Sequence, residues 1–349
     1  TNSSRSVQSR SADRSAIIRA GEARVSGKDA ANDLKDAYDD LTMEIIFLGN
    51  IAEQDISLHF PYMSFSYVEK YIQQASEDEQ VEKIKISLYR VADESLLTTS
   101  LLNALKNGKK VTVFIEAKAR FDERNNIDWG KKFEDAGANV LYSYPKIKVH
   151  SKIMLIQRRE KSDLRNYAYI GTGNFNSKTS EIYCDHGVFT AHQKLAEELS
   201  RVFSVLEGEM IIPREKHLLI SPFSTRKAFS DMIDRETRNA RNGVKASITA
   251  KMNSLEDVEL VELLYRASKA GVKIRLLVRG FTCLIPGVEG LSENIYITSI
   301  VDQFLEHGVG RLHKHGTLFF RPVFQLGIRD LFLNGDAQVL VNRNQPVLA

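Results

Sequence analysis

Two short stretches determine how this chain can be interpreted: Val149–Lys152 (VHSK), which opens an apolar run, and Tyr169–Asn176 (YIGTGNFN), rich in glycine and asparagine. In an extended segment, residues i and i+2 point to the same face. The first stretch therefore predicts a strand from which His150 and Lys152 project together, with apolar neighbours buried around them. The second stretch predicts a turn at the end of another strand.

The pairing of an imidazole with an ammonium group indicates phosphorus chemistry. A neutral imidazole can attack phosphorus and carry the phosphoryl group, while a nearby ammonium holds the oxygens on which charge develops. A lone histidine is more often structural. Here Lys152, Gly171 and Asn174 accompany it, so we expect His150 and Lys152 to be catalytic in phosphoryl or phosphodiester transfer through a covalent histidine.

Length and composition set the class of protein. The 349 residues suffice for two domains with their own cores, and 43% hydrophobic and 27% charged residues are ordinary for a globular protein. A net charge of +3 does not indicate a nucleic-acid partner, and none is predicted. Basic residues do crowd around His150 in the sequence, which would focus a polyanionic substrate, although a solvated basic face is an equal alternative. They are Lys146, Lys148, Lys152, Arg158 and Arg159.

The remaining composition points to the cytoplasm. Cys184 and Cys283 are the only cysteines and form neither a metal-ligand motif nor a disulfide framework, which is typical of a reducing compartment. No apolar run approaches the roughly 18 residues of a membrane span, and the polar start Thr1–Arg5 lacks the apolar core of a signal peptide. We predict a cytoplasmic protein without stable membrane insertion and leave peripheral attachment open.

Strand and helix patterns alternate from residue 45 onward, which predicts an α/β fold. Residues 1–44 predict a mobile start followed by one or two helices; residues 45–212 and 213–349 predict two α/β domains. The expected strands are 81–89, 110–117, 140–144, 149–157 and 167–170, and the expected helices are 95–107 and 127–136, each ended by a glycine.

An internal repeat supports two similar halves. Residues 107–115 (NGKKVTVFI) resemble residues 270–278 (AGVKIRLLV) at an offset of 163, and residues 85–90 line up with 247–253. Each half would then contain a strand, a helix, a glycine turn and a second strand.

Three arginines follow strands of this repeat: Arg90, Arg120 and Arg279. Ligands in α/β sheets bind beyond the carboxyl ends of the strands. One arginine at such a position is usually a surface residue, but three at matching positions predict an anion site.

The combination of His150, Lys152 and the segment Gly171–Asn174 resembles the histidine-lysine signature of the phospholipase D superfamily, whose members pair two similar halves. More specifically, seven ordered blocks resemble the two C-terminal catalytic domains of the polyphosphate kinase family. These blocks are Phe60–Phe65, Leu88–Arg90, Ala119–Ile127, Ile170–Asn176, Val278–Gly280, Gly290–Asn294 and Phe304–His307. The resemblance implies two phospholipase D-like halves, each a mixed or mostly parallel sheet flanked by helices.

The resemblance implies an ATP:polyphosphate phosphotransferase. It would move the terminal phosphate of ATP reversibly onto inorganic polyphosphate, releasing ADP, with Mg²⁺ as cofactor and as a homo-oligomer, dimer or tetramer. The implied roles are phosphohistidine for His150, proton donor or phosphate ligand for His307, nucleotide or phosphate contact for Tyr183, Arg279 and Asn174, and the magnesium and phosphate positions for Arg90 and Arg120. Because a guanidinium cannot coordinate bare Mg²⁺, we interpret Arg90 and Arg120 as phosphate clamps.

The chain also departs from the family pattern. Gln157 replaces the superfamily's acidic residue five places after Lys152, so a different group would orient the histidine. After His307 the expected basic residue is Val309, and residues 308–320 have no counterpart. The second domain is therefore expected to be atypical or incomplete after position 307.

Two alternatives remain open from the residues. A phospholipase D-type phosphodiesterase would also use two histidines but would not need the arginine pair or nucleotide contacts. A polyanion-binding module without catalysis would bind polyphosphate in a salt-dependent way. The absence of a Walker A glycine loop means that any nucleotide would be held otherwise than in a P-loop enzyme.

Overall fold

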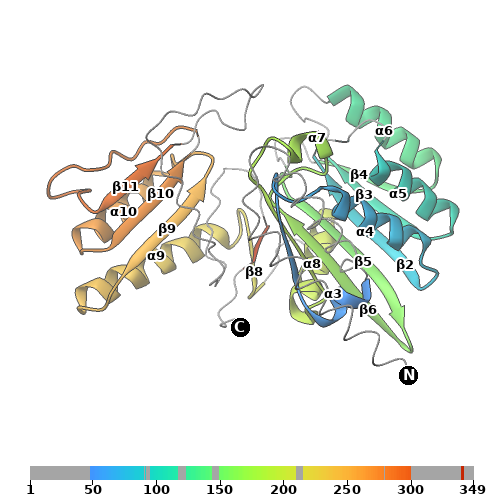
Figure 1. The fold of residues 1–349 in the computed structure, drawn as a ribbon, viewed down its shortest axis with the longest axis horizontal. Helices are drawn as coiled ribbons and strands as arrows, with labels where there is room; N and C mark the ends of the chain where they lie inside the picture. Colours follow the sequence, from blue (N-terminus) through green and yellow to red (C-terminus); the bar gives the residue numbers. More distant parts are fainter. Residues whose placement is uncertain are drawn as a thin grey trace, which may run out of the picture.

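The computed structural model describes residues 48–89, 91, 95–116, 123–143, 149–209, 215–278 and 280–299, together with the backbone of 339–341. These residues form two α/β units, each a sheet flanked by helices, as the sequence predicted (Figure 1). The helices predicted for residues 1–44 lie outside the described residues.

The first unit is built on a mixed sheet of seven strands in the order β1-β7-β6-β5-β2-β3-β4, in which β2 and β3, and β3 and β4, are parallel neighbours and the other neighbours are antiparallel. Its strands are β1 (Ile56–His59), β2 (Val81–Leu88), β3 (Lys110–Ile115), β4 (Asn139–Tyr142), β5 (Lys152–Glu160), β6 (Asp163–Gly171) and β7 (His186–Thr190). Its helices are α3 (Leu48–Glu53), α4 (Ser66–Glu77), α5 (Leu96–Lys106), α6 (Glu123–Asp135), α7 (Ser177–Ser180) and α8 (Gln193–Leu206).

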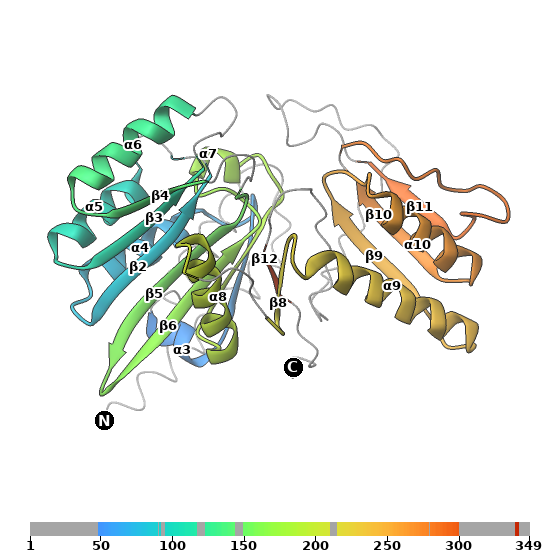
Figure 2. The same ribbon diagram turned by 180° about the vertical axis from the view of Figure 1, so that it is seen from behind.

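Helices cover both faces of this sheet. Helices α3 to α6 pack on one face, where the alternate residues Ile84, Ile86 and Leu88 of β2 enter the larger core. Helix α8 packs on the other face, over Ile153 and Leu155 of β5. Figures 1 and 2 show α4 and α8 on opposite sides of the sheet. Because side chains alternate along a strand, β5 supplies both cores at once.

Local signals in the sequence predicted α5 well. Ser95 caps its first turn: the hydroxyl accepts the Thr98 N–H at 3.2 Å, and the Thr98 hydroxyl oxygen in turn accepts the Ser95 N–H at 3.0 Å, which completes a capping box. Gly108 follows with φ of 75°, which glycine adopts without strain. Helix α6 instead begins four residues before its predicted start, because its first turn is polar rather than apolar.

The predicted bounds of β5 and β6 were wrong. Strand β5 begins at Lys152 rather than at 149, and β6 runs from Asp163 rather than from 167. The two strands pair along their full length as an antiparallel hairpin, from Lys152 opposite Gly171 to Glu160 opposite Asp163. Hydrogen bonding between the strands extends them through polar residues that an apolar pattern does not include.

The second unit repeats the strand–helix–strand arrangement of the first. It comprises α9 (Thr225–Arg241), β9 (Ser247–Met252), α10 (Val258–Lys269), β10 (Lys273–Val278) and β11 (Ile295–Thr298). All three strands are parallel, in the order β11-β10-β9. The offset of 163 residues places β3 on β10 and α5 on α10, so the predicted repeat is confirmed. Helices α9 and α10 share one core with this sheet, while Arg275 and Tyr296 are exposed on its other face.

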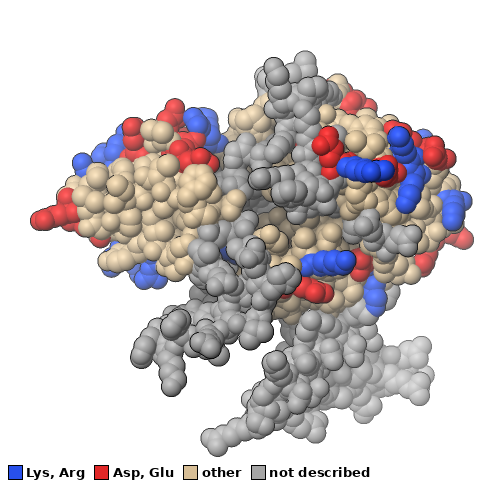
Figure 3. All heavy atoms as spheres, turned by 90° about the horizontal axis from the view of Figure 1, so that it is seen from above, with Lys and Arg blue, Asp and Glu red and all other residues tan. Residues whose placement is uncertain are grey.

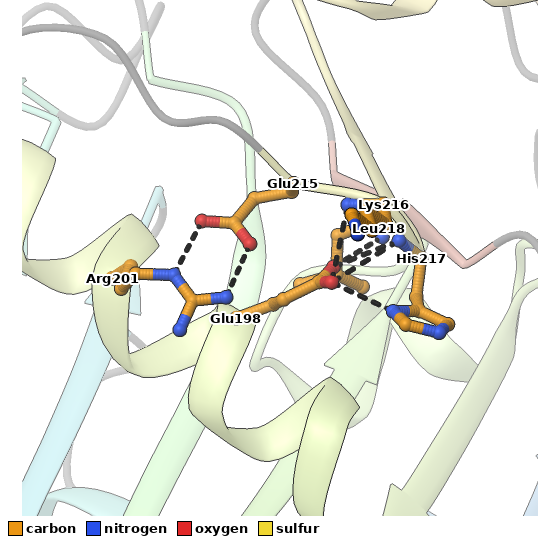
Figure 4. A network of polar contacts seen from close by, with 6 residues as sticks. All are labelled: Glu198, Arg201, Glu215, Lys216, His217 and Leu218. Carbon is orange, nitrogen blue, oxygen red and sulfur yellow. Dashed lines mark hydrogen bonds and ion pairs between the residues drawn. The ribbon is translucent and has the colours of Figure 1, made fainter.

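A short strand, β8 (Leu218–Ile220), joins the two units and pairs with β12 (Val339–Val341). Leu218 and Ile220 belong to the core under α8, whereas Leu219 belongs to the core of the second unit. The alternation of a strand thus places one three-residue segment in two cores. Glu198 of α8 anchors its start, since the carboxylate accepts the N–H groups of residues 216 to 218 and contacts His217 Nδ1 at 2.7 Å (Figure 4).

Two observations concern the predicted location of the protein. Both cysteines are free thiols, Cys184 half-buried and Cys283 exposed. Across the described ranges, no helix has the length and apolar character needed to cross a bilayer.

The Glu198 network predicts a pH-dependent contribution to stability. Burial acts to raise the pKa of this carboxyl group, but the hydrogen bonds from the His217 side chain and the backbone outweigh it and lower the pKa. The stabilisation is therefore present above the ordinary carboxyl pKa and is lost as pH falls through the lowered one. We expect Glu198→Gln to reduce the free energy of unfolding by about 2 kcal/mol at neutral pH, and by less in acid, in urea titrations.

Glu197 supplies the matched control for this experiment. It is the exposed neighbour on the same helix and accepts one hydrogen bond from Gln193. Glu197→Gln should change stability by no more than about 0.5 kcal/mol at either pH. A Glu198→Gln deficit of the same size at neutral and acidic pH would contradict the linkage.

Candidate active site

The segments that carry His150, Asn174 and Tyr183 meet at one edge of the first sheet. Lys152, the first residue of β5, lies opposite Gly171, the last residue of β6, and Gly171 lies opposite Gly187 of β7. His150 precedes the strand, in an irregular segment that follows an isolated bridge residue. The prediction that His150 itself lies on the strand was therefore wrong, whereas its place at the strand's tip is confirmed.

The aromatic ring of Tyr89 is the point where the two predicted catalytic side chains converge. The His150 ring meets it edge-on, with centroids 4.7 Å apart and an interplanar angle of 75°. The Lys152 ammonium lies 5.1 Å from the centroid of the same ring and donates a hydrogen bond of 2.6 Å to the His150 carbonyl oxygen. Only 3% of Lys152 is exposed, so this cation is held beside His150 by buried contacts.

A buried glutamate holds the backbone just before His150. Glu116, 1% exposed, follows β3; its carboxylate accepts the Val149 N–H at 2.8 Å and the Ser143 hydroxyl at 2.7 Å. Hydrogen bonds to a carboxylate are roughly twice as strong as neutral ones. The approach to His150 is therefore tied to the carboxyl end of β3, which is separated from β5 by β2 in the sheet.

A fully buried asparagine fixes the carboxyl ends of β2 and β3 together. The Asn126 amide donates to the carbonyl oxygens of Tyr89 and Glu116, both at 2.9 Å, and its own oxygen accepts the Val91 N–H at 3.0 Å. Backbone groups that leave a sheet need such partners when buried. Asn126 thereby positions Tyr89, the residue on which His150 rests.

The glycine-rich turn predicted from the sequence follows β6. Its Asn176 caps α7, accepting the Thr179 N–H at 3.2 Å. The Asn174 amide oxygen is buried and has no hydrogen-bond partner among the described residues. A buried amide without a partner is uncommon and costs free energy, so Asn174 retains hydrogen-bonding capacity beside the site.

Tyr183 lies in the loop between α7 and β7 and is half-buried. Its N–H donates to the Thr179 carbonyl at 3.0 Å. A tyrosine beside an apolar residue is usually a core residue, but this one is absent from the hydrophobic cores. Its placement is compatible with contact to a ligand.

The basic cluster predicted around His150 is only partly formed by the described residues. Arg158 and Arg159 lie near the far end of β5, next to the start of β2, where they pair with Asp78 and Glu82. Lys146 and Lys148 lie outside the described residues. Seen from above, acidic and basic side chains are interspersed over the described surface (Figure 3). Of the predicted cluster, Lys152 is the cation that the described structure places beside His150.

Gln157, which replaces the acidic residue of the superfamily, has no contact with His150. It lies further along β5, and its amide donates to Asn166 of β6 at 3.2 Å. The groups that orient the His150 segment are instead Glu116 and Tyr89. Neither role was predicted from the sequence. The signal that could have identified them is that Glu116 directly follows β3 and Tyr89 directly follows β2.

Four predicted site residues, Arg90, Arg120, Arg279 and His307, lie outside the described residues, so their predicted roles stay predictions. The magnesium role fits the donor chemistry poorly, because a guanidinium offers no lone pair to a cation. Among the described residues, no group of three or more histidine, cysteine, aspartate or glutamate side chains could hold a metal.

The fold and the site define a two-unit α/β protein with a histidine-lysine site at the tip of a sheet. Residues 46–212 match the family model "Polyphosphate kinase C-terminal domain 1", and residues 218–314 match "Polyphosphate kinase C-terminal domain 2". The chain belongs to the polyphosphate kinase family.

Individual relatives agree with this assignment. The polyphosphate kinase of Vibrio vulnificus (strain YJ016) is 49% identical over 257 residues, 74% of this chain and 37% of that protein. The polyphosphate kinase of Escherichia coli (strain K12) is 46% identical over 266 residues, 76% of this chain and 39% of that protein. The crystal structure of polyphosphate kinase from Porphyromonas gingivalis superposes with a TM-score of 0.66 at 37% identity, covering 73% of this chain and 42% of that one. The chain thus spans well under half the length of these relatives.

The Asn126 network predicts a large effect of one side chain. Replacing Asn126 with alanine would leave three buried backbone groups without a partner, which should lower the free energy of unfolding by about 2 to 3 kcal/mol. Asn139, exposed at the start of β4, is the control, and Asn139→Ala should change stability by less than about 0.5 kcal/mol. Equal stability of the two variants in urea titrations would contradict this role.

Proposed function

We propose that this chain carries out the phosphoryl transfer of a polyphosphate kinase, moving the terminal phosphate of ATP reversibly onto inorganic polyphosphate through a phosphohistidine at His150. The observation that carries the proposal is the family match across both C-terminal domains, together with the convergence of His150 and Lys152 on Tyr89. The proposal includes the assignment of residues 45–212 and 213–349 as two phospholipase D-like halves behind a helical segment, 1–44.

In the first step, an imidazole nitrogen of His150 forms a bond to the terminal phosphorus of ATP as the bond from that phosphorus to the bridging oxygen breaks, and ADP leaves. In the second step, a terminal oxygen of polyphosphate takes the phosphoryl group and frees the imidazole. Catalysis of such transfers comes mainly from positioning and from cations around the three equatorial oxygens. Lys152 supplies one such charge, since its ammonium is held beside His150.

The remaining predicted residues complete this proposal. Arg90 and Arg120 would clamp phosphate oxygens, and His307 would donate a proton or bind phosphate. Tyr183 and Arg279 would contact the nucleotide, with Asn174 on the phosphates. Mg²⁺ would be held on the phosphate oxygens of ATP and would offset part of their negative charge. We also propose that the protein is cytoplasmic and forms a homo-oligomer.

A covalent label tests the nucleophile. Incubation with γ-labelled ATP and Mg²⁺ should attach phosphate to the chain in an acid-labile, base-stable form, the behaviour of a phosphoramidate. His150→Ala should abolish the label. The control is His192→Ala, an exposed histidine at the start of α8, which should label normally. An unlabelled wild-type chain, or label that survives His150→Ala, would refute the proposed intermediate. Hydrolysis of a phosphodiester to a phosphomonoester and an alcohol without ATP would favour a phosphodiesterase.

The clamp role predicts a cost for losing either arginine. Arg90→Ala and Arg120→Ala should each remove about 2 kcal/mol or more of transition-state stabilisation, roughly thirtyfold in kcat/KM, as judged from the loss of comparable charged donors. Arg241→Ala, exposed at the end of α9, serves as the control and should leave kcat/KM unchanged. Near-normal rates in both clamp variants would show that these guanidinium groups do not hold the transferred phosphate.

A further inference from the structure

A carboxylate outside the predicted site holds the glycine–asparagine loop. Asp185, just before β7, accepts a hydrogen bond from the Thr172 hydroxyl at 2.7 Å. The same hydroxyl accepts the His186 N–H at 3.0 Å, and the Thr172 N–H donates to the His186 carbonyl at 2.9 Å. Thr172 is therefore tied through both its side chain and its backbone to residues 185 and 186.

The Asp185 carboxylate also lies directly against the backbone of the next residue. A Cβ atom added to Gly173 would be 2.5 Å from Asp185 Oδ2 and 2.8 Å from its Cγ. Only a residue without a side chain fits at that distance. The loop therefore packs closely against this carboxylate at Gly173, the residue directly before Asn174.

Asp185 is in turn positioned by the second unit. Lys251, on β9, donates from its ammonium to the Cys184 carbonyl oxygen at 3.1 Å. The N–H of the same peptide unit, that of Asp185, donates to the Phe60 carbonyl at 3.2 Å, and the Asp185 carbonyl accepts the Phe60 N–H at 2.8 Å. Because a peptide unit is planar, hydrogen bonds at its oxygen and its N–H together fix its orientation.

The surroundings of Lys251 suit an ammonium. The rings of His59 and His186 stack beside it with centroids 4.4 Å apart and an interplanar angle of 6°. Burial lowers the pKa of both imidazoles to about 4, and His186 and Lys251 contribute to this shift in His59, as Lys251 does in His186. Both rings are therefore neutral near pH 7 and place no second positive charge beside the lysine.

We propose that Asp185 and Lys251 act as one pair of positioning residues, through which the second unit sets the Gly171–Asn174 loop at the phosphate site of the first unit. The inference rests on the proposed function. Neither residue needs to touch the substrate: Lys251 orients the peptide that carries Asp185, and Asp185 orients the loop that carries Asn174. Catalytic geometry in one half then depends on how the other half is docked.

A double-mutant cycle tests this pairing on the full chain. The variants are Lys251→Met, Asp185→Ala and the double variant, and the measurement is the rate of labelling by γ-labelled ATP at saturating concentration. Each single variant should lose about tenfold, since misplaced positioning groups cost up to about 100-fold. If the two residues act as one unit, the double variant should be no slower than the slower single variant. The loss should appear in the rate rather than in the KM for ATP.

Two further variants separate positioning from general damage to the fold. Lys251→Arg keeps a charged donor and should label at a rate within about threefold of the wild-type rate. If Lys251→Met acted only by removing a packing contact, restoring a donor at this position would not restore the rate. Lys273→Met removes an exposed lysine from the neighbouring strand β10 and should change the labelling rate by less than about twofold. When it is combined with Asp185→Ala, the two fold-changes should simply multiply. Independent, multiplicative effects of Lys251→Met and Asp185→Ala, or a normal rate in Lys251→Met, would overturn the inference. A wild-type chain that takes no label would instead refute the proposed function.

Discussion

The register of the antiparallel pairing between β5, β6 and β7 is the constraint on which the candidate site depends. It places Lys152, Gly171 and Gly187 in one row across the sheet. The segments that continue from this row carry His150, just before β5, and Asn174, just after β6, so both meet at the same edge. A slip of one residue would move every side chain of a strand to the other face. The apolar residues of β5 specify the register strongly, because they alternate between the larger core on one side of the sheet and the core under α8 on the other.

Irregular backbone at the ends of these strands is kept rigid by buried polar side chains. Where a strand stops, its N–H and C=O groups lose their ladder partners, and burial without replacements would be costly. Asn126 replaces them for the ends of β2 and β3, and Glu116 replaces them before His150. The two N–H groups and the oxygen of the Asn126 amide each form a hydrogen bond with a different backbone group. The backbone around the candidate site can therefore be irregular and still be held in one place.

The elements that the sequence predicted well are those specified by local signals. The capping box at Ser95 and the glycine at 108 define α5, and the repeated apolar pattern located β3 and β10 at matching bounds. The start of β5 could not be predicted, because it depends on pairing with residues near position 171 rather than on its own apolar run. The contacts of Tyr89 and Glu116 with the His150 segment are equally non-local. Sequence spacing identified His150 and Lys152 as neighbours, but only the fold shows that both contact the aromatic ring of Tyr89, the residue that follows β2.

The joint between the two units limits how far they can move against each other. The three residues of β8 divide between two hydrophobic cores by simple alternation, so movement of one unit against the other would expose apolar surface in both. Glu198 prevents the strand from sliding by accepting consecutive N–H groups at its start. A second contact between the units, the hydrogen bond from Lys251 to the Cys184 carbonyl, reaches the loop region directly. An apolar strand and a directional hydrogen bond act differently: the first resists separation, and the second sets orientation. Together they hold the loop that precedes β7 in a fixed place against the second unit.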